Sequence, residues 1–212
     1  MVSSLDEILS PSQRQVIETL NTPEQIQAYL DGVQYPATER NRCPLNVLSD
    51  EQAHCLDGGL FAAAALRRLG DPPLIIDLLP EPGTDDDHVL AIFKRNGRYG
   101  ALAKSNFTGL RAREPVYRSL RELVMSYFDF FYNVNGEKTL RAYTLPLNLK
   151  VFDRLNWMGS DAGADAIERR LKELRTIPLI SSEMAAALSP VDPLTYRAGM
   201  LVANQAGLYK PE

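Results

Sequence analysis

Apolar and polar residues alternate along the chain with helical spacing near both ends and with strand-like spacing in the middle. Short helices are predicted over residues 11–20 and 23–31, each with a proline at the first helical position. Helical spacing returns at about 164–175, 181–188 and 193–205. Helices, then strands, then helices again predict an α+β fold.

The centre of the chain carries the strand signals. The segment "PPLIIDLL" (72–79) is rich in branched residues and predicts a strand. In "DHVLAIFKRNGRYGALAKSN" (87–106), Asn-Gly stands between two apolar runs, which favours a tight turn. We therefore expect an antiparallel hairpin over residues 86–106 that turns at Asn96-Gly97. The unbroken apolar run 89–92 predicts a central strand that is buried on both faces.

Three further segments complete the expected order of elements. Residues 116–132 carry a wide apolar stripe after Pro115, which predicts one long helix. Residues 139–152 are expected to be extended. The segment "RCPLNVLSDEQ" (42–52) is predicted to be a loop that leads into the next helix.

The segment "AHCLDGGLFAAAALRRLG" (53–70) predicts a helix that holds Cys55. Its two adjacent glycines, Gly58 and Gly59, each cost about 1 kcal/mol in a helix interior relative to alanine. They are explained if a strand or a substrate backbone approaches the helix closely beside Cys55. Ser49 and Gln52 fit a capping box for this helix, and a break near residues 53–54 is the alternative.

Length, charge and cysteine content narrow the class of protein. The 212 residues fit a single domain, 1–212, and 45% hydrophobic with 24% charged residues is typical of a globular protein. A net charge of −4 and a pI near 5.3 argue against a nucleic-acid partner. The N-terminus lacks the features of a signal peptide, and no apolar run reaches the length of a membrane span. Two cysteines are too few for a disulfide framework, so we expect a cytoplasmic protein with reduced thiols.

The candidate chemistry depends on Cys55 and His88. A nucleophilic thiolate needs a nearby base or cation, and His88 heads a strand that can pack against the Cys55 helix. A third polar group usually orients the histidine. A two-residue turn places Ser105 opposite His88, whereas a three-residue turn places Asn106 there. Amide chemistry favours Asn106, so the predicted catalytic residues are Cys55, His88 and Asn106.

These segments resemble the transglutaminase-like branch of the papain-like cysteine enzymes over residues 45–107. In that family a cysteine opens a helix that ends in Arg, Gly and a Pro-led strand, as in "HCLDGGLFAAAALRRLGDPP". The resemblance implies a papain-like core with the cysteine helix packed on an antiparallel sheet and further helices around it. It also implies that Cys55 is the nucleophile and His88 the general base. The family commonly has Asp-Pro at the third position, where this chain reads "AKSN".

The function expected from these residues is cysteine-dependent acyl transfer, as in hydrolysis of an amide or peptide bond. The substrate would be a peptide or another amide, with water or an amine as the acceptor. The Cys55 amide is a candidate oxyanion donor, and Gln52 or Asn46 could supply another. No cofactor is expected, and "TDDDH" (84–88) is interpreted as a solvated loop rather than a metal site. The alternative is a catalytically inactive transglutaminase-like binding or interaction module.

Overall fold

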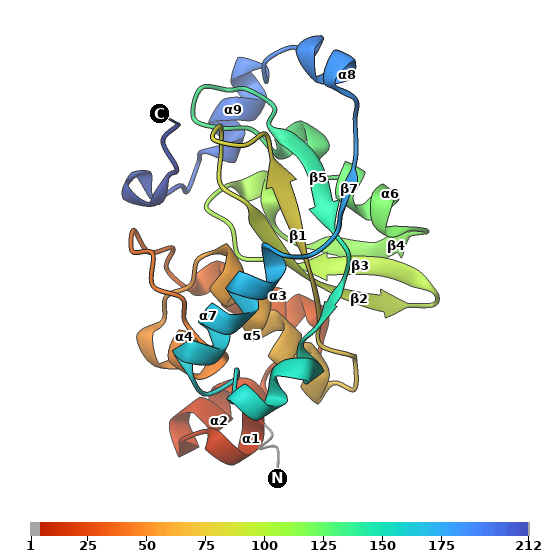
Figure 1. Cartoon of the computed structure of the whole chain (residues 1–212). Helices are drawn as coiled ribbons and strands as arrows, with labels where there is room; N and C mark the ends of the chain where they lie inside the picture. The colour runs from red at the N-terminus through yellow and green to blue at the C-terminus, as the bar shows by residue number, and fades with distance from the viewer. Residues whose placement is uncertain (1–4, 212) are drawn as a thin grey trace.

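The computed structural model describes residues 5–211, in which helices cover an antiparallel sheet (Figure 1). The α+β class predicted from the sequence is confirmed. The helices are α1 (Leu5–Ile8), α2 (Pro11–Glu18), α3 (Pro23–Gly32), α4 (Pro44–Asp50), α5 (Cys55–Arg68), α6 (Leu120–Met125), α7 (Asp161–Leu171), α8 (Ser182–Ala186) and α9 (Pro193–Gly199). The strands are β1 (Leu74–Pro80), β2 (His88–Arg95), β3 (Arg98–Leu102), β4 (Arg113–Tyr117), β5 (Leu140–Thr144), β6 (Leu147–Asn148) and β7 (Thr176–Pro178).

The sheet has the strand order β4-β3-β2-β1-β5-β7, with β6 paired to β1, and every pairing is antiparallel. The β2–β3 hairpin confirms the predicted turn, because Arg95 pairs with Arg98 across Asn96-Gly97. Both turn residues have positive φ (52° and 73°), as tight hairpin turns require. The hairpin is shorter than predicted, since β2 begins at His88 and β3 ends at Leu102.

Two hydrophobic cores lie on opposite faces of the sheet. Along β2, Val89, Ala91 and Phe93 belong to the core that contains α5. Leu90 and Ile92, which alternate with them, belong to the core that contains α6. The residues predicted to be buried on both faces are therefore buried, and β2 is a central strand between β1 and β3.

The prediction of one long helix over residues 116–132 is wrong. Residues 113–117 instead form β4, an edge strand paired with β3, and Pro115 is tolerated there because an edge strand needs fewer backbone donors. Ser119 then caps α6 by accepting a hydrogen bond from the Glu122 backbone. The apolar stripe reflects burial against the sheet by α6 and the turn that follows, rather than one continuous helix.

The prediction for residues 42–52 is also corrected. Residues 44–50 form α4, which ends at Glu51 in a left-handed conformation (φ 51°). Ser49 lies inside α4, where its hydroxyl donates to the Leu45 carbonyl, so it does not cap the next helix. The alternative of a break near residues 53–54 is confirmed, because α5 begins at Cys55 with His54 as its N-cap.

The remaining segments are shorter than predicted. Residues 139–152 contain β5 and β6 and then a 3₁₀ helix, Leu149–Leu155. In the C-terminal part, β7 lies between α7 and α8 and pairs with β5 at the edge of the sheet. Below the sheet in Figure 1, α5 lies between the sheet and the N-terminal helices, whereas α9 and the C-terminus lie at the opposite end.

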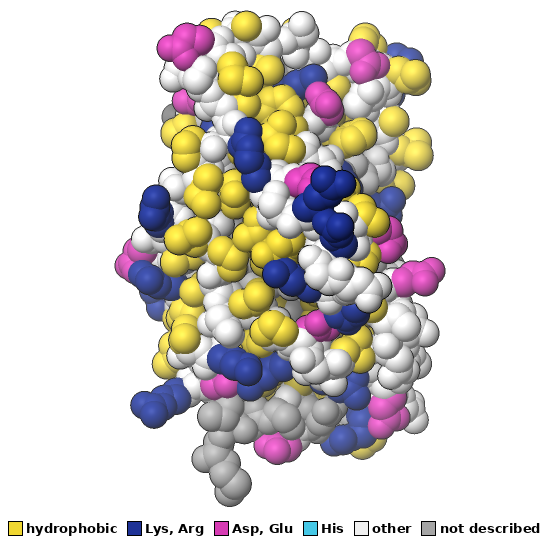
Figure 2. All heavy atoms as spheres, turned by 90° about the vertical axis from the view of Figure 1, so that its right-hand side faces the viewer, with side chains coloured by type: hydrophobic (Ala, Val, Ile, Leu, Met, Phe, Trp, Pro, Cys, Tyr) yellow, Lys and Arg dark blue, Asp and Glu magenta, His cyan; other side chains and the backbone are white. Residues whose placement is uncertain are grey.

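The face on the right-hand side of Figure 1, which is turned toward the viewer in Figure 2, is mixed in character. Figure 2 shows hydrophobic side chains in patches, with Lys and Arg side chains scattered between them. Within residues 5–211, no helix combines the length and the apolar character needed to cross a membrane.

The two glycines of α5 allow the close approach that the sequence predicted. A Cβ at Gly58 would overlap the Cβ of Lys104, which follows β3, and one at Gly59 would lie 2.7 Å from Val89 Cγ1. Lys104 cannot move away easily, because its buried ammonium donates to the carbonyls of Leu30 and Val33 at the end of α3. The α5 helix is thereby held directly against the sheet.

We predict that Gly58→Ala destabilises the fold by about 1–3 kcal/mol, the usual cost of overpacking a core. The measurement is the free energy of unfolding in urea. Gly32→Ala at the end of α3 is the matched control, since a Cβ there would meet nothing within 4 Å. Equal stability of the two variants would contradict the role of Gly58 in this contact.

Candidate functional site

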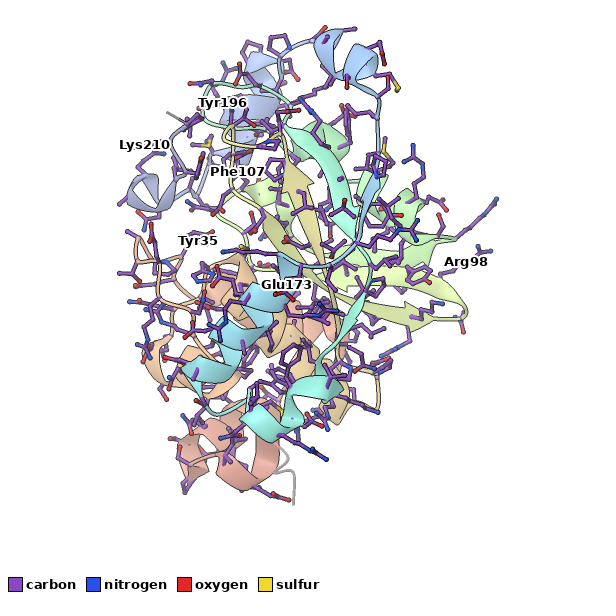
Figure 3. All side chains as sticks on the ribbon, in the orientation of Figure 1. Tyr35, Arg98, Phe107, Glu173, Tyr196 and Lys210 are labelled. Atoms are coloured by element: carbon purple, nitrogen blue, oxygen red, sulfur yellow. The ribbon has the colours of Figure 1, made fainter. Side chains whose placement is uncertain are left out.

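A cavity of about 740 Å³ lies at the N-terminus of α5. Its walls come from segments far apart in the sequence: the 35–41 loop, α5, β1, the loop before β2, α7 and the C-terminal segment. In Figure 3, Tyr35 lies between the N-terminal helices and the C-terminal segment that carries Lys210. A cavity of this size is typical of small-molecule sites.

Cys55 lines this cavity and is 6% exposed. Its thiol donates to the Asp87 carbonyl oxygen (Sγ to O, 3.7 Å), and its backbone N–H donates to the Tyr35 hydroxyl. Burial, followed by the negative charges of Asp87 and Asp86, raises the pKa of Cys55 well above its usual range. The surroundings therefore favour the neutral thiol, which is the opposite of the activated thiolate expected from the sequence.

His88 is 4% exposed and lies on the other face of the sheet. The side chain of Val89 faces α5, so that of its neighbour His88 faces the second core. The His88 Nε2 atom donates to the Leu110 carbonyl (2.7 Å), because a carbonyl can only accept. Burial lowers the pKa of His88 to about 4, so the ring is neutral.

The structure therefore does not bring Cys55 and His88 together as a nucleophile and its base. His88 lines a separate, smaller cavity of about 50 Å³, together with Ser105 and Asn106. Tyr35 and the backbone around Asp87 lie between the two cavities, since both of these residues line both of them.

Asn106 does not orient His88 in this structure. The two-residue turn pairs Ala91 with Leu102, and the same register extended along the chain places Ser105 opposite His88. The Asn106 side chain is instead bonded to the backbone of Asn204: Nδ2 donates to its carbonyl (2.9 Å), and Oδ1 accepts from its N–H (2.7 Å). Asn106 thus fastens the C-terminal segment.

This C-terminal segment covers both cavities. Residues 207–209 line the cavity at Cys55 as well as the one at His88. The Asn204 side chain adds a third bond by donating to the Tyr35 carbonyl (2.8 Å). A Cβ at Gly207 would lie 2.7 Å from the Pro36 carbonyl oxygen, so the two backbones touch.

The polar floor of the larger cavity is a pair of aspartates. Asp77 on β1 is 2% exposed and lines the cavity, and its side chain is hydrogen-bonded to that of Asp87. Burial, followed by the charges of Asp87 and Asp86, raises the pKa of Asp77 well above its usual range. Burial also raises the pKa of Asp87 to about 6. Burial thus favours the protonated form of both carboxyl groups, and Asp77 Oδ1 has no hydrogen-bond partner.

His54 also lines the cavity, beside Cys55. Burial, followed by the positive charge of Arg42, lowers the pKa of His54 to about 4, so it is neutral at pH 7. Its Nε2 lies 3.3 Å from Asp57, a fully buried carboxyl that also accepts from the backbone N–H of Arg42. His54 and Asp57 therefore connect the start of α5 to the preceding loop.

The expected oxyanion donors are used elsewhere. The Cys55 N–H is bonded to Tyr35, and the Asn46 amide donates to Asp161 (2.8 Å). Gln52 does not line the cavity, and its side-chain oxygen accepts from Arg42 (2.9 Å). Over the described part of the chain, no group of three or more His, Cys, Asp and Glu side chains is arranged to hold a metal ion.

Sequence reasoning missed Asp77 as a site residue, although the signal was present. A lone acidic residue inside the apolar strand "LIIDLL" is unusual, because a buried carboxyl needs a partner or a function. Asp86 and Asp87 belong to "TDDDH" (84–88), whose successive carboxylates predict a solvated loop and gave no sign that Asp87 would meet Asp77. Tyr35 carried no signal, since only tertiary packing brings it to Cys55.

No family model matches the chain, and no curated protein matches it.

We predict that Asp77→Asn becomes more stable relative to wild type as the pH rises above about 4. The raised pKa means that folded Asp77 keeps its proton at pH values where the unfolded chain has lost it. The contribution of Asp77 to the free energy of unfolding is therefore fully present below the pKa that it has in the unfolded chain. It is lost as the pH rises through the pKa that it has in the folded protein. Asparagine has no such proton to lose.

Urea unfolding of both proteins between pH 4 and 8 measures this difference, which includes the accompanying change in Asp87, the hydrogen-bond partner of Asp77. A difference in unfolding free energy that does not change with pH would show that Asp77 ionises normally.

We predict that Asn106→Ala loosens the cover formed by residues 204–209 and speeds labelling of Cys55. The reagent is methyl methanethiosulfonate, with rates read by mass spectrometry. Cys43 is fully buried outside this cavity and serves as the internal reference. Ser105→Ala is the matched control, because it leaves both bonds to Asn204 in place. No change in the ratio of Cys55 to Cys43 labelling would contradict the covering role.

Proposed function

We propose that this protein is a non-catalytic member of the transglutaminase-like group that binds a small ligand in the cavity at the N-terminus of α5. The observation that carries this proposal is the separation of Cys55 from His88 by the sheet. A thiol surrounded by carboxyl groups, without a base or cation beside it, is poorly suited to act as a nucleophile.

The family assignment is supported by the packing of a helix that begins at Cys55 on an antiparallel sheet. The sequence order is also that of the resemblance: the cysteine helix, then β1, then the strand headed by His88 and then β3. Asn106, the expected third catalytic residue, also supports a non-catalytic role. Its side chain is hydrogen-bonded to the backbone of the C-terminal segment.

A second candidate is the cysteine-dependent acyl-transfer enzyme, which would hydrolyse an amide or peptide bond. One observation favours it: Cys55 is the first residue of a 14-residue helix and lines a large cavity. The positive end of the helix dipole favours a thiolate there. In this structure, however, burial and the charges of Asp87 and Asp86 raise the pKa of Cys55 well above its usual range.

Alkylation by iodoacetamide across pH 6–10 separates the two candidates. For the binding protein we expect Cys55 to react slowly at pH 6, with a rate that rises into the alkaline range and is unchanged by His88→Ala. Fast reaction at pH 6 that is slowed by His88→Ala would instead establish the acyl-transfer enzyme. Cys43, whose pKa burial raises to about 11, is the reference thiol.

A fragment screen followed by NMR tests binding itself. Compounds that occupy the cavity should perturb the signals of Tyr35 and Leu56, which both line it. Cys55→Ser should keep this binding, because the thiol is only part of the wall. Loss of binding in Cys55→Ser, together with covalent adducts on the wild-type thiol, would contradict a non-catalytic role.

A further inference from the structure

The cavity at the N-terminus of α5 has more hydrogen-bond acceptors than donors. Asp77, Asp86 and Asp87 all line it, and Asp77 Oδ1 is buried without a partner. A buried carboxyl oxygen without a partner is costly and calls for an explanation. An occupant that brings N–H donors would satisfy it.

The cavity also lacks a positive charge to balance these carboxyl groups. Among the described residues, Lys172 is the only Lys or Arg side chain that lines it. Lys172 is paired with Glu168 (2.6 Å), which lines the same cavity. One ammonium group therefore faces five carboxyl side chains in the lining, those of Glu39, Asp77, Asp86, Asp87 and Glu168, and the cavity is acidic overall.

We infer that the cavity binds a guanidinium group against the Asp77–Asp87 pair. This inference rests on the proposed binding function and names the chemistry of its ligand. The group can be carried by a free small molecule or by an arginine side chain of a peptide.

Geometry favours a guanidinium over an ammonium group. Asp77 lies on β1 and Asp87 just before β2, and the register makes them diagonal neighbours, since Asp77 pairs with Val89. The planar guanidinium presents its N–H groups as a fork that can contact two carboxyl groups at once. It is also more weakly hydrated than an ammonium group and loses less on reaching Asp77, which is only 2% exposed.

The walls suit an aliphatic stem behind this charged head. Leu56, Val89 and Leu171 line the cavity beside the polar floor. Arginine buries its methylene groups along apolar surface while its head makes polar contacts. The volume of about 740 Å³ is sufficient for such a ligand.

Calorimetric titration with four probes tests this inference. The probes are Nα-acetyl-arginine methylamide, its neutral isostere Nα-acetyl-citrulline methylamide, Nα-acetyl-lysine methylamide and ethylguanidine. We expect the arginine probe to bind at least about tenfold more tightly than the citrulline probe, and also more tightly than the lysine probe. Ethylguanidine binding as tightly as the arginine probe indicates a free small molecule, whereas much weaker binding indicates a peptide side chain.

The double variant Asp77→Asn/Asp87→Asn removes the charge of the floor while keeping its shape. We expect it to bind the arginine probe at least about tenfold more weakly, with little change for the citrulline probe. Glu114→Gln, at an exposed position of the edge strand β4, is the control and should bind as wild type does. Urea unfolding confirms that the double variant is folded.

The outcomes separate this inference from the proposed function. Equal affinity for the arginine and citrulline probes, or tighter binding of the lysine probe, overturns the guanidinium assignment and leaves the cavity as a binding site. Undiminished arginine binding by the double variant overturns the placement on the aspartate pair. Absence of binding by every probe and by every fragment of the screen overturns both.

Discussion

The close packing of α5 on the sheet is the contact on which the rest of the structure depends. Gly58 and Gly59 present no side chain to Lys104 and Val89, so the helix backbone approaches the strands directly. This contact places Cys55 at the mouth of a cavity and assigns one face of the sheet to α5. Successive side chains of β1 and β2 point to alternate faces of the sheet. This alternation, the parity of each strand, decides which side chains reach the site beside α5.

The same parity explains why the site is acidic rather than a thiol–imidazole pair. Asp77 shares the α5 face with Ile75, while Leu78 and His88 face the second core. Burial favours the protonated form of Asp77, while the negative charges of Asp87 and Asp86, together with burial, suppress ionisation of the neighbouring thiol. A site of this kind is built to receive hydrogen-bond donors.

Several features of the fold could be predicted from the sequence because they depend on local chemistry. Asn96-Gly97 supplies the two positive φ angles of the hairpin turn, and the apolar run in β2 requires burial on both faces. Residues 116–132 could not be interpreted correctly, because the apolar stripe fits a helix as well as a strand followed by a short helix. Only the pairing of β4 with β3 distinguishes these two possibilities.

The sequence by itself determined the α+β class, the central hairpin, the need for close approach at Gly58 and Gly59, and the start of a helix near Cys55. The tertiary structure alone decided which side chains meet. A shift of one residue along a strand moves a side chain to the other face of the sheet, and local patterns do not specify that choice for a strand that is apolar throughout. For this reason the sequence indicated Cys55 beside His88 and Asn106. Packing instead placed Cys55 beside Asp77 and Asp87, and left Asn106 to hold the C-terminal segment.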